Sequence, residues 1–242
     1  MKKLLAIALS LSMAVCGLTA CGSAADADVK GEGVMTYAEY DAAALDSEVV
    51  VETYVQAHQS WWDNTVTCYT QDKDGGYFIY NMACSEEDAA KLVPGTKIKV
   101  TGYKSEWAGE IEITDATFEI EDGSYIAETE DLTSVLGNEA ELIKHQNEFV
   151  AFKGLTVEAA NDEGAAFMYG YDGSGAQGDD LYFNVSLDGK TYSFVVESYL
   201  CGADTDVYKA VENLKVGDTI DVEGFLYWYE GANPHIVSVT VK

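Results

Sequence analysis

The side chains that could act as acids, bases or nucleophiles are numerous in this sequence but scattered. Its three histidines, His58, His145 and His235, lie far apart, and the sequence places no catalytic partner beside any of them. The chain contains no G-x-S-x-G, H-E-x-x-H, P-loop or C-x-x-C motif. We therefore interpret each histidine as a surface residue, predict no catalytic residue and no cofactor, and favour a protein that is not an enzyme. A weak hydrolase stays open as an alternative, because 42 acidic residues make chance pairs of carboxylates easy.

Two acidic loops carry oxygen ligands at spacings that would suit a calcium ion. The residues concerned are Asp72, Asp74 and Gly75 in one loop, and Asp172, Asp179 and Asp180 in the other. Neither loop has the distal glutamate of an EF-hand at the right distance. Hairpin turns explain the same residue types, so the sequence predicts no metal site.

The cysteines beyond the N-terminal segment are Cys68, Cys84 and Cys201. Three is an odd number, so at least one thiol is free or pairs outside the chain. A Cys68–Cys84 disulfide is open, although the two residues are not opposite each other in a hairpin that turns near residues 72–76. Cys84 and Cys201 share a repeat position, which indicates small buried hydrophobic residues.

The composition is strongly acidic, with a formal net charge of −28 and no arginine. Nucleic-acid binding depends on Lys and Arg neutralising phosphates, so a nucleic-acid partner is disfavoured. The lack of arginine also removes the usual bidentate clamp for phosphates and carboxylates. We interpret the acidity as charge that keeps an exported surface soluble.

The N-terminal segment has the order of an export signal, with Lys2 and Lys3 followed by the apolar run 4–15. That run is too short to span a bilayer. Residues 18–21, Leu-Thr-Ala-Cys, resemble the lipobox of bacterial lipoproteins. The resemblance implies that residues 1–20 are a signal peptide and that Cys21 is acylated, which would place the protein outside the cytoplasm in the cell envelope, held to the membrane by its lipid alone. An ordinary secretory peptide cut near Ala20 is the alternative.

The rest of the chain contains one phrase twice, "LVPGTKIKVTGY" at 92–103 and "LKVGDTIDVEGF" at 214–225. In the first copy we predict strands at 49–57, 65–71 and 77–82, a short helix in 85–92, and strands through Ile98 and Val100 and over 111–120. In the second copy we predict strands at 149–159, 181–187 and 191–199, a helix with Val207, Ala210, Val211 and Leu214 on one face, and strands through Ile220 and Val222 and over 235–241. Gly95 and Gly217 end the helices, and Gly102 and Gly224 let the fourth strand bend.

This order of three strands, a helix and two strands resembles the OB-fold, a five-stranded barrel. The resemblance implies a mainly β protein with two tandem five-stranded OB-like barrels, each with a helix between strands 3 and 4. The predicted domains are a flexible tether at 21–33, a first barrel at 34–123, a linker at 124–136, and a second barrel at 137–242 that opens with a helix near 137–146. A pair of β-sandwich domains is the alternative, but a sandwich would not need a helix at the same place in each copy.

Aromatic residues gather in the loops that border the binding face of an OB-fold. These candidate ligand-binding residues are Trp61, Trp62, Trp107, Tyr169, Tyr171, Tyr227, Trp228 and Tyr229. Rings beside acids and amides suit an oligosaccharide, while a cationic peptide or a polyamine would also fit. The same rings could instead plug the barrel ends or pack between the domains. The sequence therefore predicts a surface-anchored extracytoplasmic binding or interaction module, with a structural spacer in an envelope assembly as the main alternative.

Overall fold

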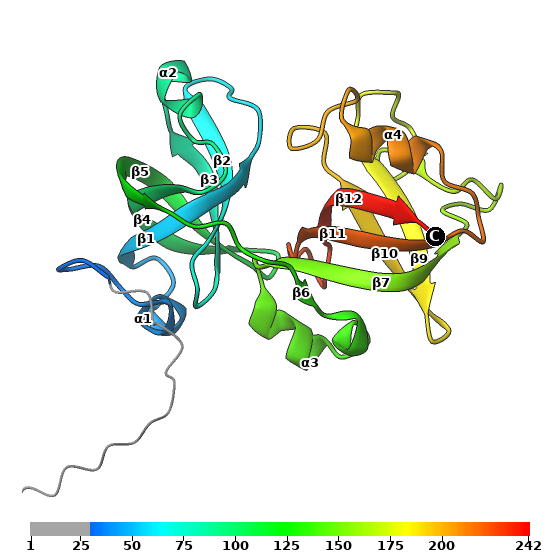
Figure 1. The fold of residues 1–242 in the computed structure, drawn as a ribbon, viewed down its shortest axis with the longest axis horizontal. Coiled ribbons are helices and arrows are strands. Elements are labelled where there is room, and N and C mark those ends of the chain that lie inside the picture. Colours follow the sequence, from blue (N-terminus) through cyan, green and yellow to red (C-terminus); the bar gives the residue numbers. More distant parts are fainter. Residues whose placement is uncertain (1–29) are drawn as a thin grey trace, which may run out of the picture.

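Two β-barrels lie side by side in the computed structural model, which describes residues 30–242 (Figure 1). In the first barrel the strands close in the order β1-β2-β3-β5-β4. They are β1 (Glu48–His58), β2 (Thr65–Gln71), β3 (Gly76–Ala83), β4 (Thr96–Trp107) and β5 (Glu110–Ser124). Neighbouring strands are antiparallel except β3 and β5, which are parallel, and helix α2 (Glu86–Ala89) joins β3 to β4. The predicted signal peptide and Cys21 lie outside the described residues.

The second barrel repeats this ring of strands. Its members are β7 (Phe149–Glu158), β9 (Leu181–Leu187), β10 (Lys190–Val196), β11 (Thr219–Phe225) and β12 (His235–Val241). The pairings run β7-β9-β10-β12-β11 and back to β7, again with one parallel pair, β10 and β12, and α4 (Asp206–Glu212) joins β10 to β11. Two short strands extend the sheet, β6 (Glu130–Asp131) beside β7 and β8 (Met168–Tyr169) beside β9. The predicted fold class, tandem OB-like barrels, is confirmed.

Glycine stands at the bend of the fourth strand in each barrel because a side chain would not fit there. At Gly102 the register of β4 against β5 shifts, and an added Cβ would lie 2.7 Å from Ile113 Cγ2. At Gly224 the register of β11 against β12 shifts, and an added Cβ would lie 2.3 Å from the carbonyl oxygen of His235. These bends fold the strands across their neighbours and allow each sheet to close.

The first glycine of each repeated phrase stands in the turn before the fourth strand, in the left-handed conformation; the prediction that it ends the helix was wrong, because α2 is capped by Ala90 and α4 by Asn213. Gly95 has φ of 91° and Gly217 has φ of 93°, values that residues with a Cβ adopt only with strain. Each donates its N–H to a strand of its own barrel, Gly95 to the carbonyl of Val55 at 2.7 Å and Gly217 to that of Val157 at 2.8 Å. The repeated phrase therefore performs the same structural task in both barrels.

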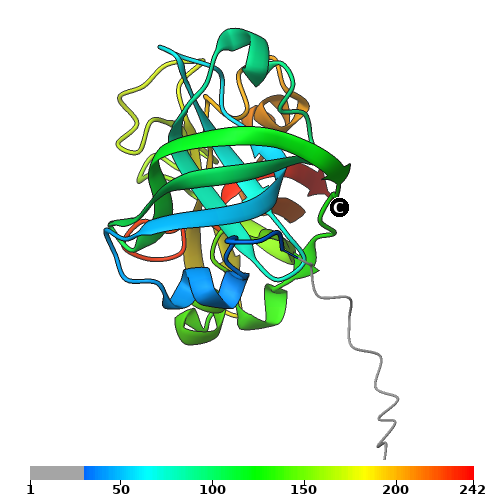
Figure 2. The same ribbon diagram turned by 90° about the vertical axis from the view of Figure 1, so that its left-hand side faces the viewer.

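Short helices flank the barrels on one side of the molecule, where α1 (Tyr37–Ala42) and α3 (Glu139–Leu142) lie (Figures 1 and 2). Thr36 and Glu39 form a capping box at the start of α1. The predicted helix near 137–146 consists of α3 followed by the 3-10 turn η2 (Ile143–His145). Before it, the predicted linker 124–136 contains β6 and a second 3-10 turn, η1 (Thr133–Val135).

Each barrel has its own apolar core, and a third cluster of buried aromatic rings joins the two. This cluster contains Tyr69 of β2, Phe78 of β3 and Phe225 of β11. The rings of Tyr69 and Phe225 stack with centroids 4.7 Å apart, and the hydroxyl of Tyr69 lies 2.6 Å from Nδ1 of His235. Aromatic burial of this kind stabilises domain interfaces, so the two barrels dock on each other.

The turn between β4 and β5 of the first barrel is held by backbone and side-chain contacts from the second barrel. Gln146 Nε2 donates to the carbonyl of Gly109 at 2.9 Å. The N–H of Glu230 donates to the carbonyl of Ala108 at 2.7 Å, and the N–H of Trp228 donates to Oε2 of Glu110 at 2.8 Å. These directional contacts fix the register between the two barrels.

The thiols of Cys68, Cys84 and Cys201 are free and buried, so the Cys68–Cys84 disulfide that the sequence left open does not form. Burial raises the pKa of all three thiols, that of Cys201 to about 11. Their packing role agrees with the sequence prediction. Within residues 30–242, no helix is long and apolar enough to cross a membrane.

Candidate functional site

A cavity of about 1040 Å³ lies between the two barrels, lined by residues of both. A second cavity of about 670 Å³ adjoins it, since Gln59, Tyr80 and Glu197 line both. We call the two cavities together the inter-barrel groove. Volumes of this order are typical of ligand sites, and the groove exists only because the barrels dock on each other.

Exposed aromatic rings stand along the whole groove. Trp107, Tyr171 and Tyr229 line the larger cavity and are 62%, 77% and 52% exposed. Trp62 lines the adjoining cavity and is 76% exposed, beside the exposed ring of Tyr199. The loop before β2 reaches the second barrel here, because the N–H of Ser60 donates to the carbonyl of Tyr199 at 2.8 Å. Each of the two cavities therefore has exposed rings available to a ligand.

The structure brings five of the eight predicted aromatic residues to this groove, which are Trp62, Trp107, Tyr171, Tyr227 and Tyr229. Tyr227 is half-buried, its ring stacked on His235 at 4.2 Å between centroids.

The other three predicted residues pack into the protein. Trp61 lies against the core of the first barrel, and its Nε1 donates to the carbonyl of Cys84 at 2.9 Å. Trp228 is buried in the second core, and the hydroxyl of Tyr169 donates to Oε1 of Glu212 at 2.7 Å. None of the three lines the groove.

Carboxylates and neutral polar groups fill the spaces between the rings. Glu112, Asp180 and Glu197 line the larger cavity. Asp180 accepts hydrogen bonds from the N–H and the hydroxyl of Ser198 at 2.8 and 2.7 Å. Among the described residues that line the groove there is no lysine, so it offers negative charge and hydrogen-bond acceptors.

Burial shifts the pKa values of several side chains of the groove. Burial, and then the charge of Asp180, raises the pKa of Glu197 to about 7, although Oε2 accepts a hydrogen bond from the N–H of Leu200 at 2.8 Å. His235 is buried, so its interpretation as a surface residue was wrong, and burial lowers its pKa to about 3, which leaves the imidazole neutral at physiological pH. Burial likewise raises the pKa of Glu112. The charge of the groove therefore changes mainly through Glu197 near neutral pH.

We expect Glu197→Gln to stabilise the protein at pH 8. A folded-state pKa above the unfolded value means that the contribution of Glu197 to stability is present below about pH 4.5 and is lost as the pH rises through about 7. Glutamine copies the neutral carboxyl and keeps an acceptor for Leu200, so its curve of unfolding free energy against pH is flatter between pH 5 and 8. Urea unfolding at four pH values measures this. Glu163→Gln on an exposed loop is the control, and a Glu197→Gln protein that is less stable at pH 8 contradicts the assignment.

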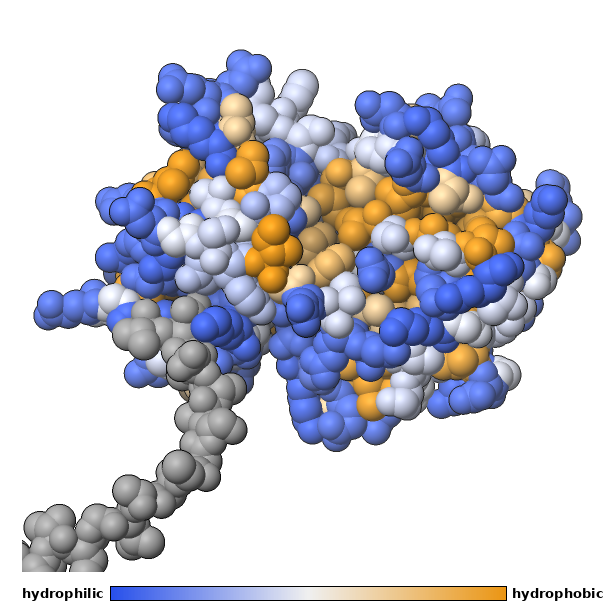
Figure 3. Space-filling model, viewed as in Figure 1, coloured by the Kyte–Doolittle hydropathy of each residue, from blue (hydrophilic) through white to orange (hydrophobic). Residues whose placement is uncertain are grey.

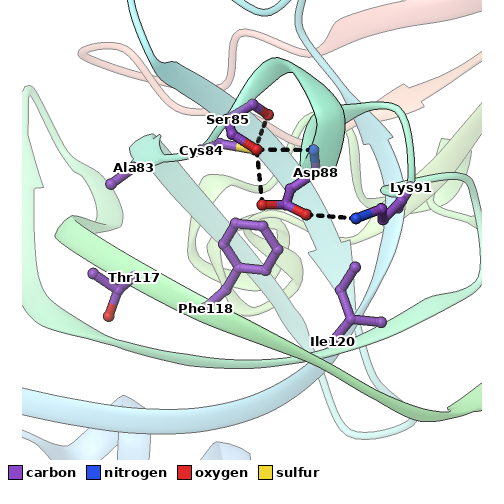
Figure 4. A pocket seen from close by; sticks show the side chains of 8 residues that line it. All are labelled: Ala83, Cys84, Ser85, Asp88, Lys91, Thr117, Phe118 and Ile120. Atoms are coloured by element: carbon purple, nitrogen blue, oxygen red, sulfur yellow. Dashed lines mark hydrogen bonds and ion pairs between the residues drawn. The ribbon is translucent and has the colours of Figure 1, made fainter.

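Two further surface hollows are smaller than either cavity of the groove. Under α2, a cavity of about 570 Å³ is lined by residues of α2, its flanking turns, the end of β3, and β5 (Figure 4). Its polar side chains cap the helix, since the Ser85 hydroxyl accepts from the N–H of Asp88 at 3.1 Å, and Asp88 pairs with Lys91 at 2.8 Å. At the junction of the barrels, where apolar residues gather (Figure 3), Phe149, Phe225 and others line a crevice of about 410 Å³.

The acidic loops that the sequence compared with calcium sites are closed by their own hydrogen bonds. Asp72 is fully buried, accepts from the N–H groups of Asp74 and Gly75 and from the hydroxyl of Tyr77, and pairs with Lys30 at 2.6 Å. In the other loop, Asp172 accepts from the N–H and hydroxyl of Ser174, and Asp179 from the N–H of Ala176. These are turn contacts, as the hairpin interpretation expects.

Glu112, Asp180, Glu197, Tyr80 and Tyr182 also line the groove and were missed by the sequence analysis. Four of them lie on strands or at a strand end, outside the aromatic loops, whereas Asp180 ends the acidic loop before β9 and was considered only as a calcium ligand. The available signal was the alternation of Tyr80 and Phe78 on one face of β3, and of Tyr182 with Asp180 around β9. These faces point at the neighbouring barrel.

The fold and the groove define the class of protein, a tandem OB-fold protein with a groove between its barrels. The solved structures that are similar to it include HIN domains. The p204 HINb domain is 13% identical, with 83% of this chain and 100% of that chain covered and a TM-score of 0.37. The tetrameric p202 HIN2 is 12% identical (82% and 96% covered, TM-score 0.35), and an Ifi202 HINa domain in complex with 20-bp double-stranded DNA is 11% identical (81% and 98%, TM-score 0.35).

Matches at this level of similarity do not show what this chain binds. No family model matches the chain, and no curated protein matches its sequence. The residues of the groove itself therefore carry the information about function.

Proposed function

We propose that this chain is an extracytoplasmic binding module, lipid-anchored through Cys21, whose ligand site is the inter-barrel groove. The observation that carries the proposal is the row of exposed rings along two adjoining cavities. Trp62, Trp107, Tyr171 and Tyr229 are all more than half exposed, which is costly for large rings unless a partner covers them. A structural spacer would have no need to keep these rings exposed inside one groove.

An oligosaccharide is the ligand class that the groove supports best. Flat rings cover the apolar faces of sugars, and the neutral side chains of Gln59, Ser193 and Asn233 line the same cavity as hydrogen-bonding partners for hydroxyls. The two cavities are contiguous and each contains exposed rings. This length suits a chain of several sugar units better than one small molecule.

A cationic peptide or polyamine is the second candidate, favoured by the charge of the groove. Glu112, Asp180 and Glu197 stand among aromatic rings, and no described lysine lines the cavity to neutralise them. A ligand ammonium would gain both carboxylate contacts and attraction to the ring faces. Such a ligand would bind more tightly as the pH rises through about 7, because Glu197 becomes charged there.

Nucleic acid is not proposed as a ligand. The DNA in the Ifi202 HINa structure belongs to that protein. This chain has a net charge of −28 and no arginine, and phosphates entering the groove would meet its carboxylates.

Glycan and peptide arrays test the proposal, followed by titration of the strongest hit. We expect binding of an oligosaccharide. We expect Trp62→Ala and Trp107→Ala each to weaken this binding by about tenfold or more, since a ring that the ligand covers contributes about 2 kcal/mol to the binding free energy. Thermal unfolding of both variants should stay near that of the parent protein. Tyr103→Ala is the matched control, because this ring is 46% exposed on β4 and does not line the groove.

The results of this experiment distinguish the candidate functions. Hits confined to cationic peptides, with affinity that rises with pH, would favour the second candidate. Cleavage of a bound glycan would favour the weak hydrolase, with Asp180 and Glu197 as the first carboxylates to replace. An equal loss of affinity in Tyr103→Ala and in the two tryptophan variants, or no hit on either array, would contradict a ligand site in the groove. Either result would favour the structural spacer.

A further inference from the structure

We propose that Glu130, His145 and Glu148 bind a divalent transition-metal ion such as Zn²⁺. One ligand atom of each residue lies within 4.8 Å of the others. His145 Nδ1 is 2.9 Å from Glu148 Oε2 and 3.4 Å from Glu130 Oε2. His145 of η2 and Glu148 in the turn before β7 are three residues apart, and the fold brings Glu130 of β6 to this pair.

The distances between His145 Nδ1 and the two carboxylate oxygens suit a metal ion bound in place of the hydrogen on Nδ1. Zinc lies about 2.0–2.2 Å from imidazole nitrogen and carboxylate oxygen, which sets neighbouring ligand atoms about 3–3.5 Å apart. The two separations that involve His145 are already near that range. Imidazole with carboxylates is a donor set for zinc and its neighbours in the transition series, whereas calcium takes oxygen ligands alone. Three protein ligands would leave one position of a tetrahedral ion open.

A plain ion pair explains this cluster less well than a metal does. Nδ1 of His145 carries at most one hydrogen, yet carboxylate oxygens of both Glu130 and Glu148 converge on it. The neighbouring Lys144 pairs with Glu141 at 2.7 Å, on the exposed side of the segment. One ring hydrogen can therefore serve only one of the two carboxylates well, while a metal ion would serve both.

A metal ion bound by these three residues would stabilise the contact between the two barrels. The segment that follows His145 docks on the first barrel, since Gln146 Nε2 donates to the carbonyl of Gly109 and Asn147 Nδ2 to that of Ile111 at 3.0 Å. Phe149 N–H donates to Oε1 of Gln71 at 2.7 Å. A metal bound beside this segment would hold the residues that keep the barrels together, independently of any ligand in the groove.

The test is titration calorimetry and thermal unfolding of the purified protein without a polyhistidine tag, after treatment with a chelator. We expect saturable binding of Zn²⁺, a higher melting temperature with the metal, and no comparable effect of Ca²⁺. His145→Ala and Glu148→Gln should weaken Zn²⁺ binding by about 100-fold. The matched control is His58→Ala, a histidine whose Nδ1 lies 2.7 Å from the carbonyl oxygen of the adjacent Gln59, and it should bind as the parent does.

A milder variant keeps the proposal testable if His145→Ala or Glu148→Gln fails to fold. The side chain of Glu130 is 57% exposed, so Glu130→Gln should fold normally and still weaken Zn²⁺ binding about tenfold. Zn²⁺ affinity that is unchanged in Glu130→Gln, or no saturable Zn²⁺ binding in the parent protein, overturns the metal site.

Discussion

Replacing Trp228 by alanine is expected to lower the free energy of unfolding by about 3–5 kcal/mol, the usual cost of removing a large buried ring. Trp228 is 9% exposed and belongs to the core of the second barrel. Its ring also covers Gly109 of the first barrel, where an added Cβ would lie 2.8 Å from Trp228 Cδ1. The cavity would therefore open in the second core and at the contact between the barrels together.

Trp107→Ala is the matched control for this prediction, because Trp107 precedes the same β4–β5 turn but is 62% exposed. Its loss should change the unfolding free energy by less than about 1 kcal/mol. Urea unfolding of both variants measures the difference, and tryptophan quenching by acrylamide in the parent reports the exposed rings. Equal losses of stability in the two variants would contradict the assignment of Trp228 to the core and of Trp107 to the exposed groove.

The strands and corners of both barrels could be predicted because they are determined locally. Gly102 and Gly224 stand where an added Cβ would strike the neighbouring strand, so the need for glycine is visible in the repeated phrase itself. Ile98 and Val100 alternate with polar residues, and this pattern likewise indicates that one face of β4 is buried. Features that depend on a strand and its immediate neighbours therefore leave a pattern in the sequence.

The site could be predicted only in part, because it depends on how two barrels dock. Tyr69 stands among the consecutive buried residues of β2, which signals that both faces of this strand are covered, but nothing in the sequence says by what. The choice of aromatic residues in the loops beside the binding face included Trp62 and Trp107, which are exposed, but also Trp228, which packs into the core of the second barrel. Glu197 was missed because its pKa and its place in the groove depend on residues of distant segments.

The second large effect is expected from Gly76→Ala at the contact between the barrels. An added Cβ would lie 2.2 Å from the carbonyl carbon of Asn147 and 2.6 Å from the backbone nitrogen of Glu148. Both obstacles are backbone atoms, so no change of rotamer relieves the clash, and the segment 147–149 must move away from the first barrel. That movement would break the hydrogen bond from Phe149 N–H to Gln71.

We expect the two barrels of Gly76→Ala to fold but to dock poorly, because each has a separate core. Small-angle scattering should show a larger radius of gyration, protease should cut more readily within 124–136, and ligand affinity should fall if the groove is the site. Gly202→Ala is the control, since an added Cβ there would lie 3.4 Å from Asp204 Oδ1, an ordinary contact. A Gly76→Ala protein with the parent's scattering curve would mean that the backbone yields locally and that docking does not depend on this contact. Loss of both barrels in one unfolding transition would mean instead that each core needs the other, since a destabilised interface then lowers the stability of the whole chain.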